Sequence, residues 1–213
     1  MTASTVVHLL RHAEVHNPEG LLYGRLPGYH LSETGRSMAD MVAKALSGRD
    51  ITALLSSPLE RAQETAAPLA DALGLTVRTD ERLIEAANIF EGVALGAMFR
   101  TPRHYRHFWN PGRPSWGEPY ADIIRRMRGA IDDVRAEARG HEAVLVSHQL
   151  PIWTIRQAAE RRRLWHDPRR RQCALASVTS LTFEGDRLTS IGYSEPAGAL
   201  IKPPGPNSRG SRR

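Results

Sequence analysis

Short, largely apolar segments alternate with amphipathic helical patterns along this chain, and the alternation limits its fold more than any other feature. The segments TVVHLL, ITALL and AVLVS occupy residues 5–10, 51–55 and 143–147. They are too short for helices, and continuous enough to be strands buried on both faces. Because helical patterns separate them, we predict an α/β fold: a three-layer αβα sandwich with a mostly parallel central sheet.

Helix start signals and apolar stripes place the helices. Ser32-Glu33-Thr34-Gly35 opens a first helix, and Ser57-Pro58-Leu59-Glu60 has the pattern of a capping box, with Ser57 as N-cap, that opens a second. Residues 118–139 carry the longest helical pattern, and Pro151 starts a further helix. The expected apolar stripes are Met38, Met41, Val42, Ala45 and Leu46 in the first helix, and Ile123, Met127, Ile131, Val134 and Ala138 in the longest one.

The rest of the pattern completes a single domain over residues 1–200. Three more strands are expected, at 75–79, 177–184 and 187–193, the last two joined as a hairpin. The segment 92–117, rich in Gly, Pro, Arg and Trp, breaks the alternation, so we predict an inserted lid there. Residues 201–213 are basic and poor in apolar side chains, which predicts a disordered tail.

The composition limits the class of protein and the cell compartment that we expect. The 213 residues are 41% hydrophobic and 24% charged, as in ordinary globular proteins. No apolar run approaches the roughly 18 residues that span a bilayer, and we expect no membrane partner. Cys173 is the single cysteine, which fits a reducing cytoplasm, where we expect the protein.

The formal net charge of +6 comes almost entirely from arginine. This excess either attracts anionic partners or is solvated surface. Arg161–Arg163 and Arg169–Arg171 fit a solvated helix end better than a nucleic-acid patch, and we expect no nucleic-acid partner. For the aromatic and arginine-rich segment 99–116, both stacking against a planar or acidic ligand and simple packing stay open.

Polar side chains follow each of the three buried strands. Arg11 and His12 follow the first, Ser57 and Arg61 the second, and His148 the third. Ligands of open α/β sheets bind beyond the carboxyl ends of the strands, so these residues should meet at one edge. Arg61 also lies in the first turn of a helix, where free N–H groups favour an anion. Forked guanidiniums with imidazoles are typical of a pocket for a phosphoryl group.

Four dispersed motifs resemble, in order and spacing, those of the histidine phosphatase superfamily, in the branch that includes phosphoglycerate mutases. The resemblance runs from about residue 5 to 195, and GEPYADIIRRM is similar to the family's Gly-Glu-Ser segment. It implies a phosphoglycerate mutase-like fold. The four motifs are LLRHAEVHN, SSPLERAQETA, RLIEA and VLVSHQ.

The resemblance also implies roles for these residues. His12 would attack phosphorus and form a phosphohistidine, while Glu85 would protonate the leaving oxygen and later activate water. Arg11, Arg61 and His148 would hold the non-bridging oxygens. Asn17, Ser57 and Gln149 are assigned to substrate binding. The implied activity is metal-independent hydrolysis of a small phosphomonoester, with no cofactor.

Alternatives stay open beside this hypothesis. Glu14 is a rival acid, although its closeness to Arg11 in sequence suggests a supporting role. His8, His12 and His16 have a metal-like spacing on a helix, but on a strand they stretch too far to share an ion. His166-Asp167 superficially resembles the His-Asp pair of the acid-phosphatase branch, but His148 fits that role better.

Two alternative functions stay open: a cofactor-dependent phosphoglycerate mutase, and a catalytically weakened phosphate-binding module. Mutases follow the acid with Arg-His-Tyr, whereas Ala86-Ala87-Asn88 follows Glu85 here. Ala13 and Gln149 stand where the family commonly has glycine, and we expect both to add side chains beside the pocket. The loop of Glu85 is also shorter by about one residue. Homodimer formation is left open.

Overall fold

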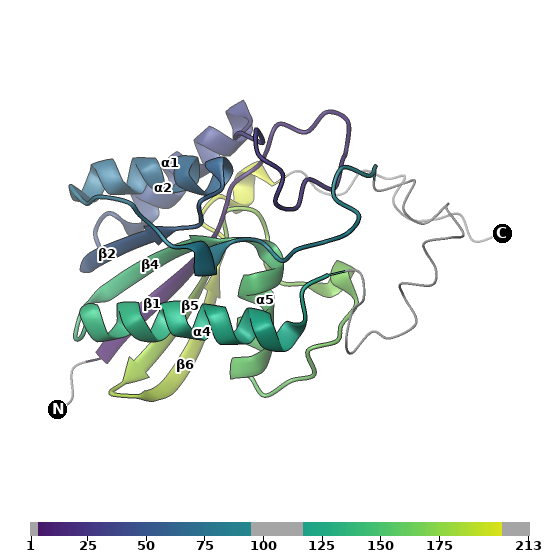
Figure 1. The fold of residues 1–213 in the computed structure, drawn as a ribbon. Helices are drawn as coiled ribbons and strands as arrows, with labels where there is room; N and C mark the ends of the chain where they lie inside the picture. Colours follow the sequence, from purple (N-terminus) through teal and green to yellow (C-terminus); the bar gives the residue numbers. More distant parts are fainter. Residues whose placement is uncertain (1–3, 95–116, 202–213) are drawn as a thin grey trace.

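The computed structural model describes residues 4–94 and 117–201. These residues form one mixed sheet of six strands in the order β3-β2-β4-β1-β5-β6 (Figure 1). The first four strands in that order are parallel to one another, and β5 and β6 form the antiparallel hairpin expected at one edge. The bounds are β1 (Ser4–Arg11), β2 (Ile51–Ser56), β3 (Arg78–Thr79), β4 (Glu142–Ser147), β5 (Val178–Glu184) and β6 (Arg187–Ser194).

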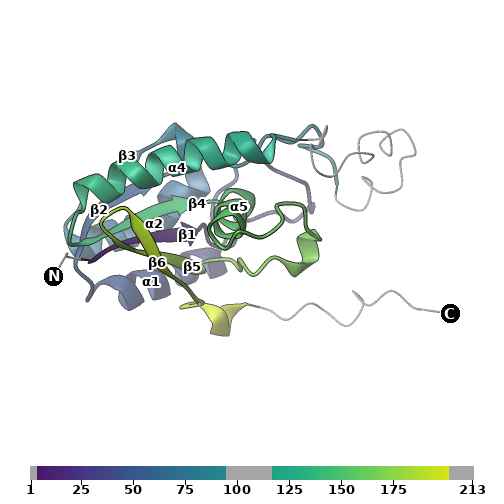
Figure 2. The ribbon, with the colours of Figure 1, turned by 90° about the horizontal axis from the view of Figure 1, so that it is seen from below.

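Helices cover both faces of the sheet, which makes the three layers of an αβα sandwich (Figures 1 and 2). The helices α1 (Glu33–Leu46) and α2 (Glu60–Leu73) pack on one face, while α4 (Tyr120–Glu137) and α5 (Gln149–Ala159) pack on the other. The predicted α/β sandwich with a mostly parallel sheet is therefore confirmed.

The central strands bury side chains on both faces, as their unbroken apolar runs predict. In β1, Val7 and Leu9 join the core beneath α4 and α5, whereas Leu10 joins the core beneath α1 and α2. In β4, Leu145 and Val146 divide in the same way. Burying such side chains contributes about 1.5–3 kcal/mol each, so the strands are held rigidly between the layers. Rigid strands fix the positions of the residues that follow them.

The start of α2 differs from the prediction. Ser57 is not its N-cap: the helix begins at Glu60, and its N-cap is Leu59, which makes no side-chain cap. The backbone N–H of Ser57 donates to the carbonyl of Val146 at 2.9 Å. This bond continues the pairing of β2 with β4 by one residue, so Ser57 stays extended and its hydroxyl is free for another partner.

Smaller differences concern element ends. Only Arg78 and Thr79 of the expected strand 75–79 pair with a neighbour, and α5 begins at Gln149 rather than Pro151. In α1 the buried stripe includes Ala39 and Ala43, while Met41 and Ala45 are not buried. Met38, Val42 and Leu46 of the predicted stripe are buried, so the predicted face overlaps the observed one and is only slightly rotated from it.

Most of the predicted lid and nearly all of the predicted tail lie outside the described residues, which omit 95–116 and 202–213. The aromatic and arginine-rich segment 99–116 is therefore not described either. Within the described ranges, every helix is too short or too polar to span a membrane.

Candidate active site

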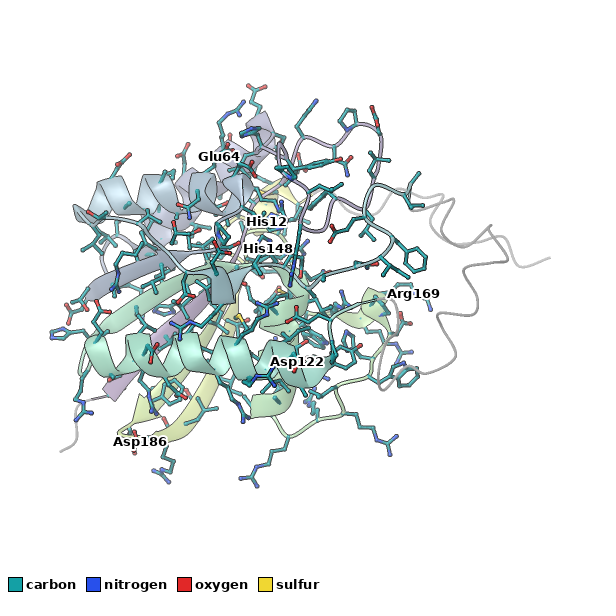
Figure 3. All side chains as sticks on the ribbon, viewed as in Figure 1. His12, Glu64, Asp122, His148, Arg169 and Asp186 are labelled. Atoms are coloured by element: carbon teal, nitrogen blue, oxygen red, sulfur yellow. The ribbon has the colours of Figure 1, made fainter. Side chains whose placement is uncertain are left out.

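Three parallel strands end together and bring the predicted residues to one edge of the sheet. The N–H of His12 donates to the carbonyl of Ser147 at 3.0 Å, so the residue after β1 lies beside the end of β4. His12, Ser57, Arg61 and His148 are each at most 2% exposed. Figure 3 shows His12 and His148 together at this edge, and their ring centroids are 5.1 Å apart.

Hydrogen bonding fixes the tautomer of His12. Its Nδ1 lies 2.8 Å from the carbonyl oxygen of Ala13, which can only accept, so Nδ1 carries the proton and Nε2 carries a lone pair. Burial lowers the pKa of His12 well below its usual range, and the charges of Arg11 and Arg61 lower it further. The imidazole is thus neutral, with one nitrogen prepared as a nucleophile.

Two guanidiniums beside His12 keep unused donors. Arg61 donates from Nη2 to the carbonyl of Gly24 at 2.6 Å, yet its buried Nε and Nη1 have no partner. Arg11 donates from Nη1 to the carbonyl of Cys173 at 2.6 Å, and its Nε is likewise buried without a partner. Neither guanidinium forms an ion pair within the described residues. Buried cations without counter-ions are costly, so the site is built to receive an anion.

The aromatic ring of Tyr23 helps to fix this arrangement. It lies against the guanidinium of Arg61, with its centroid 4.8 Å from Cζ, and meets the ring of His12 edge-on at 6.4 Å. The other side of the ring stacks on Tyr29. Sequence reasoning missed Tyr23, because nothing in its local pattern indicates which side chains it packs against.

Ser57 holds the second imidazole. Its Oγ lies 2.7 Å from Nε2 of His148, and it accepts a longer bond of 3.4 Å from the N–H of Leu59. With the Ser57 hydroxyl proton directed to Nε2, the proton of the imidazole sits on Nδ1, which is buried and has no partner. Burial lowers the pKa of His148 well below its usual range, and His12 and Arg61 lower it further. Nδ1 can therefore donate to a bound anion.

Glu85 is a partly buried carboxyl group just beyond the short 3₁₀ helix η1 (Glu81–Leu83). Its Oε1 accepts from the N–H of Ala86 at 2.8 Å, and its own carbonyl accepts from Nε of Arg25 at 2.6 Å. Burial raises the pKa of Glu85, although the charges of Arg61 and its neighbours act in the opposite direction. A carboxyl group with a raised pKa stays protonated to a higher pH, which suits a general acid.

The amides of Asn17 and Gln149 bind protein atoms in this structure. Asn17 accepts from and donates to the backbone of Leu21, which closes the loop after His12. Gln149 accepts from Nη1 of Arg171 at 3.2 Å and donates to the carbonyl of Cys173 at 3.4 Å. A role for either amide in substrate binding therefore stays a prediction.

The side chains of Ala13 and Glu14 contact the apolar core and the start of α1, respectively. Ala13 is fully buried, and its methyl group belongs to the apolar core beneath α1 and α2. The expectation that it adds bulk beside the pocket is wrong for this reason. Glu14 accepts from Oγ of Ser32, the N-cap of α1, at 2.7 Å. The partner of Glu14 is thus the start of α1 and not Arg11.

The carboxylate of Glu118 binds two arginines and, through them, supports the loop that carries Glu85. Glu118 accepts from Arg25 at 2.9 Å and from Arg126 at 2.8 and 3.0 Å. Arg126 also donates to the carbonyl of Arg82 in η1, and Arg25 to that of Glu85. The segment similar to the family's Gly-Glu-Ser motif thus fixes the backbone on which Glu85 sits.

The spaced histidines do not converge on an ion. His8 is 2% exposed and hydrogen-bonds Ser180 and Glu142 at 2.8 Å each, whereas His16 is exposed. In the part of the chain that the structure describes, no three His, Cys, Asp or Glu side chains gather so as to hold a metal ion.

Lowering the pH is expected to destabilise the fold through three buried histidines. Burial lowers the pKa of His8, His12 and His148 from 6.5. The unfolded chain therefore binds protons that the folded chain does not, so stability is complete above about pH 6.5 and is lost as the pH falls below it. Each histidine accounts for up to about 1.4 kcal/mol per pH unit.

Urea unfolding between about pH 8 and pH 5 measures this loss as a slope. The His8→Gln variant should show a shallower slope than the wild type, because one of the three titrations is removed. An equal slope in the two proteins would contradict the assignment for His8.

The sheet edge thus presents two imidazoles beside guanidiniums that have no counter-ion among the described residues. Such an arrangement suits a phosphoryl group. The comparison with protein families agrees: the model of the histidine phosphatase superfamily (branch 1) matches residues 7–195. The chain belongs to this superfamily, and the resemblance seen in the sequence is confirmed.

Individual relatives fit this assignment. An uncharacterized protein of Mycobacterium tuberculosis, Rv0525, is 58% identical over 92% of this chain and 99% of that protein. Phosphoserine phosphatase 1 of Hydrogenobacter thermophilus is 33% identical over 68% of this chain and 71% of that protein. Among solved structures, the mycobacterial glucosyl-3-phosphoglycerate phosphatase Rv2419c superposes with a TM-score of 0.72 at 28% identity, covering 84% of this chain and 90% of that one.

Proposed function

We propose that the protein is a metal-independent phosphatase that hydrolyses a small phosphomonoester through a phosphohistidine on His12. The observation that carries the proposal is the state of His12. Its Nδ1 is bound to the carbonyl of Ala13, which leaves Nε2 unprotonated beside the unpaired donors of Arg11 and Arg61. This combination supplies a nucleophile together with a phosphate cradle, by which we mean the guanidiniums of Arg11 and Arg61 that would bind the group under attack.

In the first step Nε2 of His12 attacks phosphorus, the N–P bond forms and the ester P–O bond breaks. Glu85 gives its proton to the leaving oxygen, so an alcohol departs instead of an alkoxide. Arg11, Arg61 and Nδ1 of His148 donate to the non-bridging oxygens, and the two arginines neutralise their charge. The guanidiniums fill the role that Mg²⁺ has in other phosphoryl-transfer enzymes.

In the second step the Glu85 carboxylate takes a proton from water as the water oxygen attacks phosphorus. The P–O bond to water forms, the N–P bond breaks, and inorganic phosphate leaves. Glu85 is again protonated and His12 again has its lone pair on Nε2. The raised pKa of Glu85 suits this cycle, since one group must serve as acid and then as base.

The segment after Glu85 favours hydrolysis over mutase activity. Ala86 is buried, and Asn88 uses its side-chain oxygen to accept from the N–H of Phe90. This stretch offers no cation to hold a phosphorylated acid for return transfer.

Hydrolysis of p-nitrophenyl phosphate by the purified, chelator-treated protein tests this function. We expect release of p-nitrophenol at an undiminished rate after removal of divalent metals. An absence of hydrolysis together with tight binding of inorganic phosphate would instead assign the chain as a phosphate-binding module. A rate that is restored only by an added metal would contradict the metal-independent mechanism.

A further inference from the structure

Arg171 lies near Glu85 and Arg11, at the edge of the candidate active site. It has no role in the mechanism above. It follows the 3₁₀ helix η3 (Pro168–Arg170), in a run of arginines that the sequence suggested to be solvated. Arg169 and Arg170 are exposed, but Arg171 is partly buried and is directed inward. The expectation of a uniformly solvated run is therefore wrong for its last member.

A histidine and a glutamine fix the guanidinium of Arg171. Nδ1 of His166 faces the carbonyl of Leu164 at 2.6 Å, so it carries the ring proton and Nε2 is an acceptor. Nε of Arg171 donates to this Nε2 at 2.7 Å, and Nη1 donates to Oε1 of Gln149 at 3.2 Å. Nη2 donates to no other described residue. A long flexible side chain is thus pre-organised, with Nη2 unpaired among the described residues.

The same contacts connect Arg171 to the phosphate cradle. The amide of Gln149 also donates to the carbonyl of Cys173, and that carbonyl accepts from Nη1 of Arg11. The two guanidiniums are therefore separated by one carboxamide and one carbonyl. Gln149 is the residue that couples them.

The charges of this region leave Arg171 uncompensated. It makes no ion pair within the described residues, and its electrostatic neighbours include the acid Glu85 and the cation Arg11. A phosphomonoester dianion neutralises Arg11 and Arg61, and Glu85 is uncharged while it serves as the acid. Arg171 then keeps its positive charge, with no ion-pair partner among the described residues.

We propose that Arg171 forms an anion subsite beside the phosphate cradle and that the natural substrate carries a second anionic group, a carboxylate or another phosphoryl group, which binds there. The proposal rests on the phosphate-binding role of the site, but it needs no turnover to be tested. Gln149 and His166 act as positioning residues for the subsite.

Calorimetric binding of non-hydrolysable phosphonates tests the subsite. The ligands are n-alkyl phosphonates, ω-carboxyalkyl phosphonates and α,ω-diphosphonates of matched and increasing chain length. We expect one chain length of the doubly anionic ligands to bind more tightly than its alkyl counterpart by about tenfold or more, the range expected for a hydrogen bond between charged groups. The two doubly anionic series distinguish a carboxylate from a second phosphoryl group.

The Arg171→Gln variant should lose this preference while still binding n-alkyl phosphonates, and Gln149→Ala should lose part of it. The matched control is Arg170→Gln, which removes the same charge from the adjacent exposed position and should keep the full preference. Equal affinity of the wild type for all three series, or an equal loss for all three in Arg171→Gln, would overturn the subsite. Both results are independent of hydrolysis, so a failure of catalysis would be recognised separately.

Discussion

Replacing His12 with alanine is expected to reduce kcat/KM for phosphomonoesters by at least about 10³-fold, because the nucleophile is removed. The cradle survives this change, since Arg11 and Arg61 are held by backbone carbonyls and not by His12. Steady-state hydrolysis of p-nitrophenyl phosphate, with inorganic phosphate binding measured on the same preparation, separates the loss of chemistry from a loss of the site.

The matched control is His16→Ala. His16 belongs to the same sequence motif, but it is exposed and lies outside the cradle, so this variant should retain wild-type rates. Because His12 is buried, the folding of His12→Ala is checked by its unfolding midpoint. Near-wild-type turnover by a folded His12→Ala protein would exclude His12 as the nucleophile.

Glu85→Gln is expected to have the second-largest effect, and the effect should depend on the leaving group. Alkyl phosphates need a proton on the departing oxygen, so their hydrolysis should fall by about 10²- to 10⁴-fold. The departure of p-nitrophenolate needs little help, but the activation of water is still lost. We therefore expect a burst of p-nitrophenol, one equivalent per active site, followed by slow turnover.

The pH profile of the wild type reports on the same group. Burial raises the pKa of Glu85, so the acid form persists to higher pH, and the rate for alkyl phosphates should fall as the pH rises through this pKa. The rival acid supplies the control: Glu14→Gln should keep the wild-type dependence on leaving group and pH. If Glu14→Gln shows the burst and Glu85→Gln does not, the two assignments are reversed.

The layers of the fold and the edge that holds the site could be predicted from the sequence, because both follow from short-range patterns. A strand that is apolar on both faces has to be covered by helices, and parallel strands such as β1, β2 and β4 deliver the residues after them to one edge. The ends of these strands therefore place Arg11, His12 and His148 at the same edge.

Contacts between distant segments could not be predicted in this way. The sequence around Ser57 matches a capping box, but pairing with Val146 keeps the residue extended and leaves its hydroxyl for His148. The methyl group of Ala13 turns into the core. Arg171 looks like its two neighbours in sequence, and its contacts with His166 and the distant Gln149 mark it as different.

Trapping of the phosphorylated enzyme tests the proposed phosphohistidine on His12 most directly. The protein is mixed with substrate for a few milliseconds, quenched in alkaline denaturant, which preserves phosphohistidine, and digested for mass spectrometry. We expect one phosphoryl group on the peptide that contains His12, its accumulation in Glu85→Gln, and its absence in His12→Ala. A phosphoryl group on any other residue, or turnover with no phosphorylated enzyme in Glu85→Gln, would contradict the mechanism.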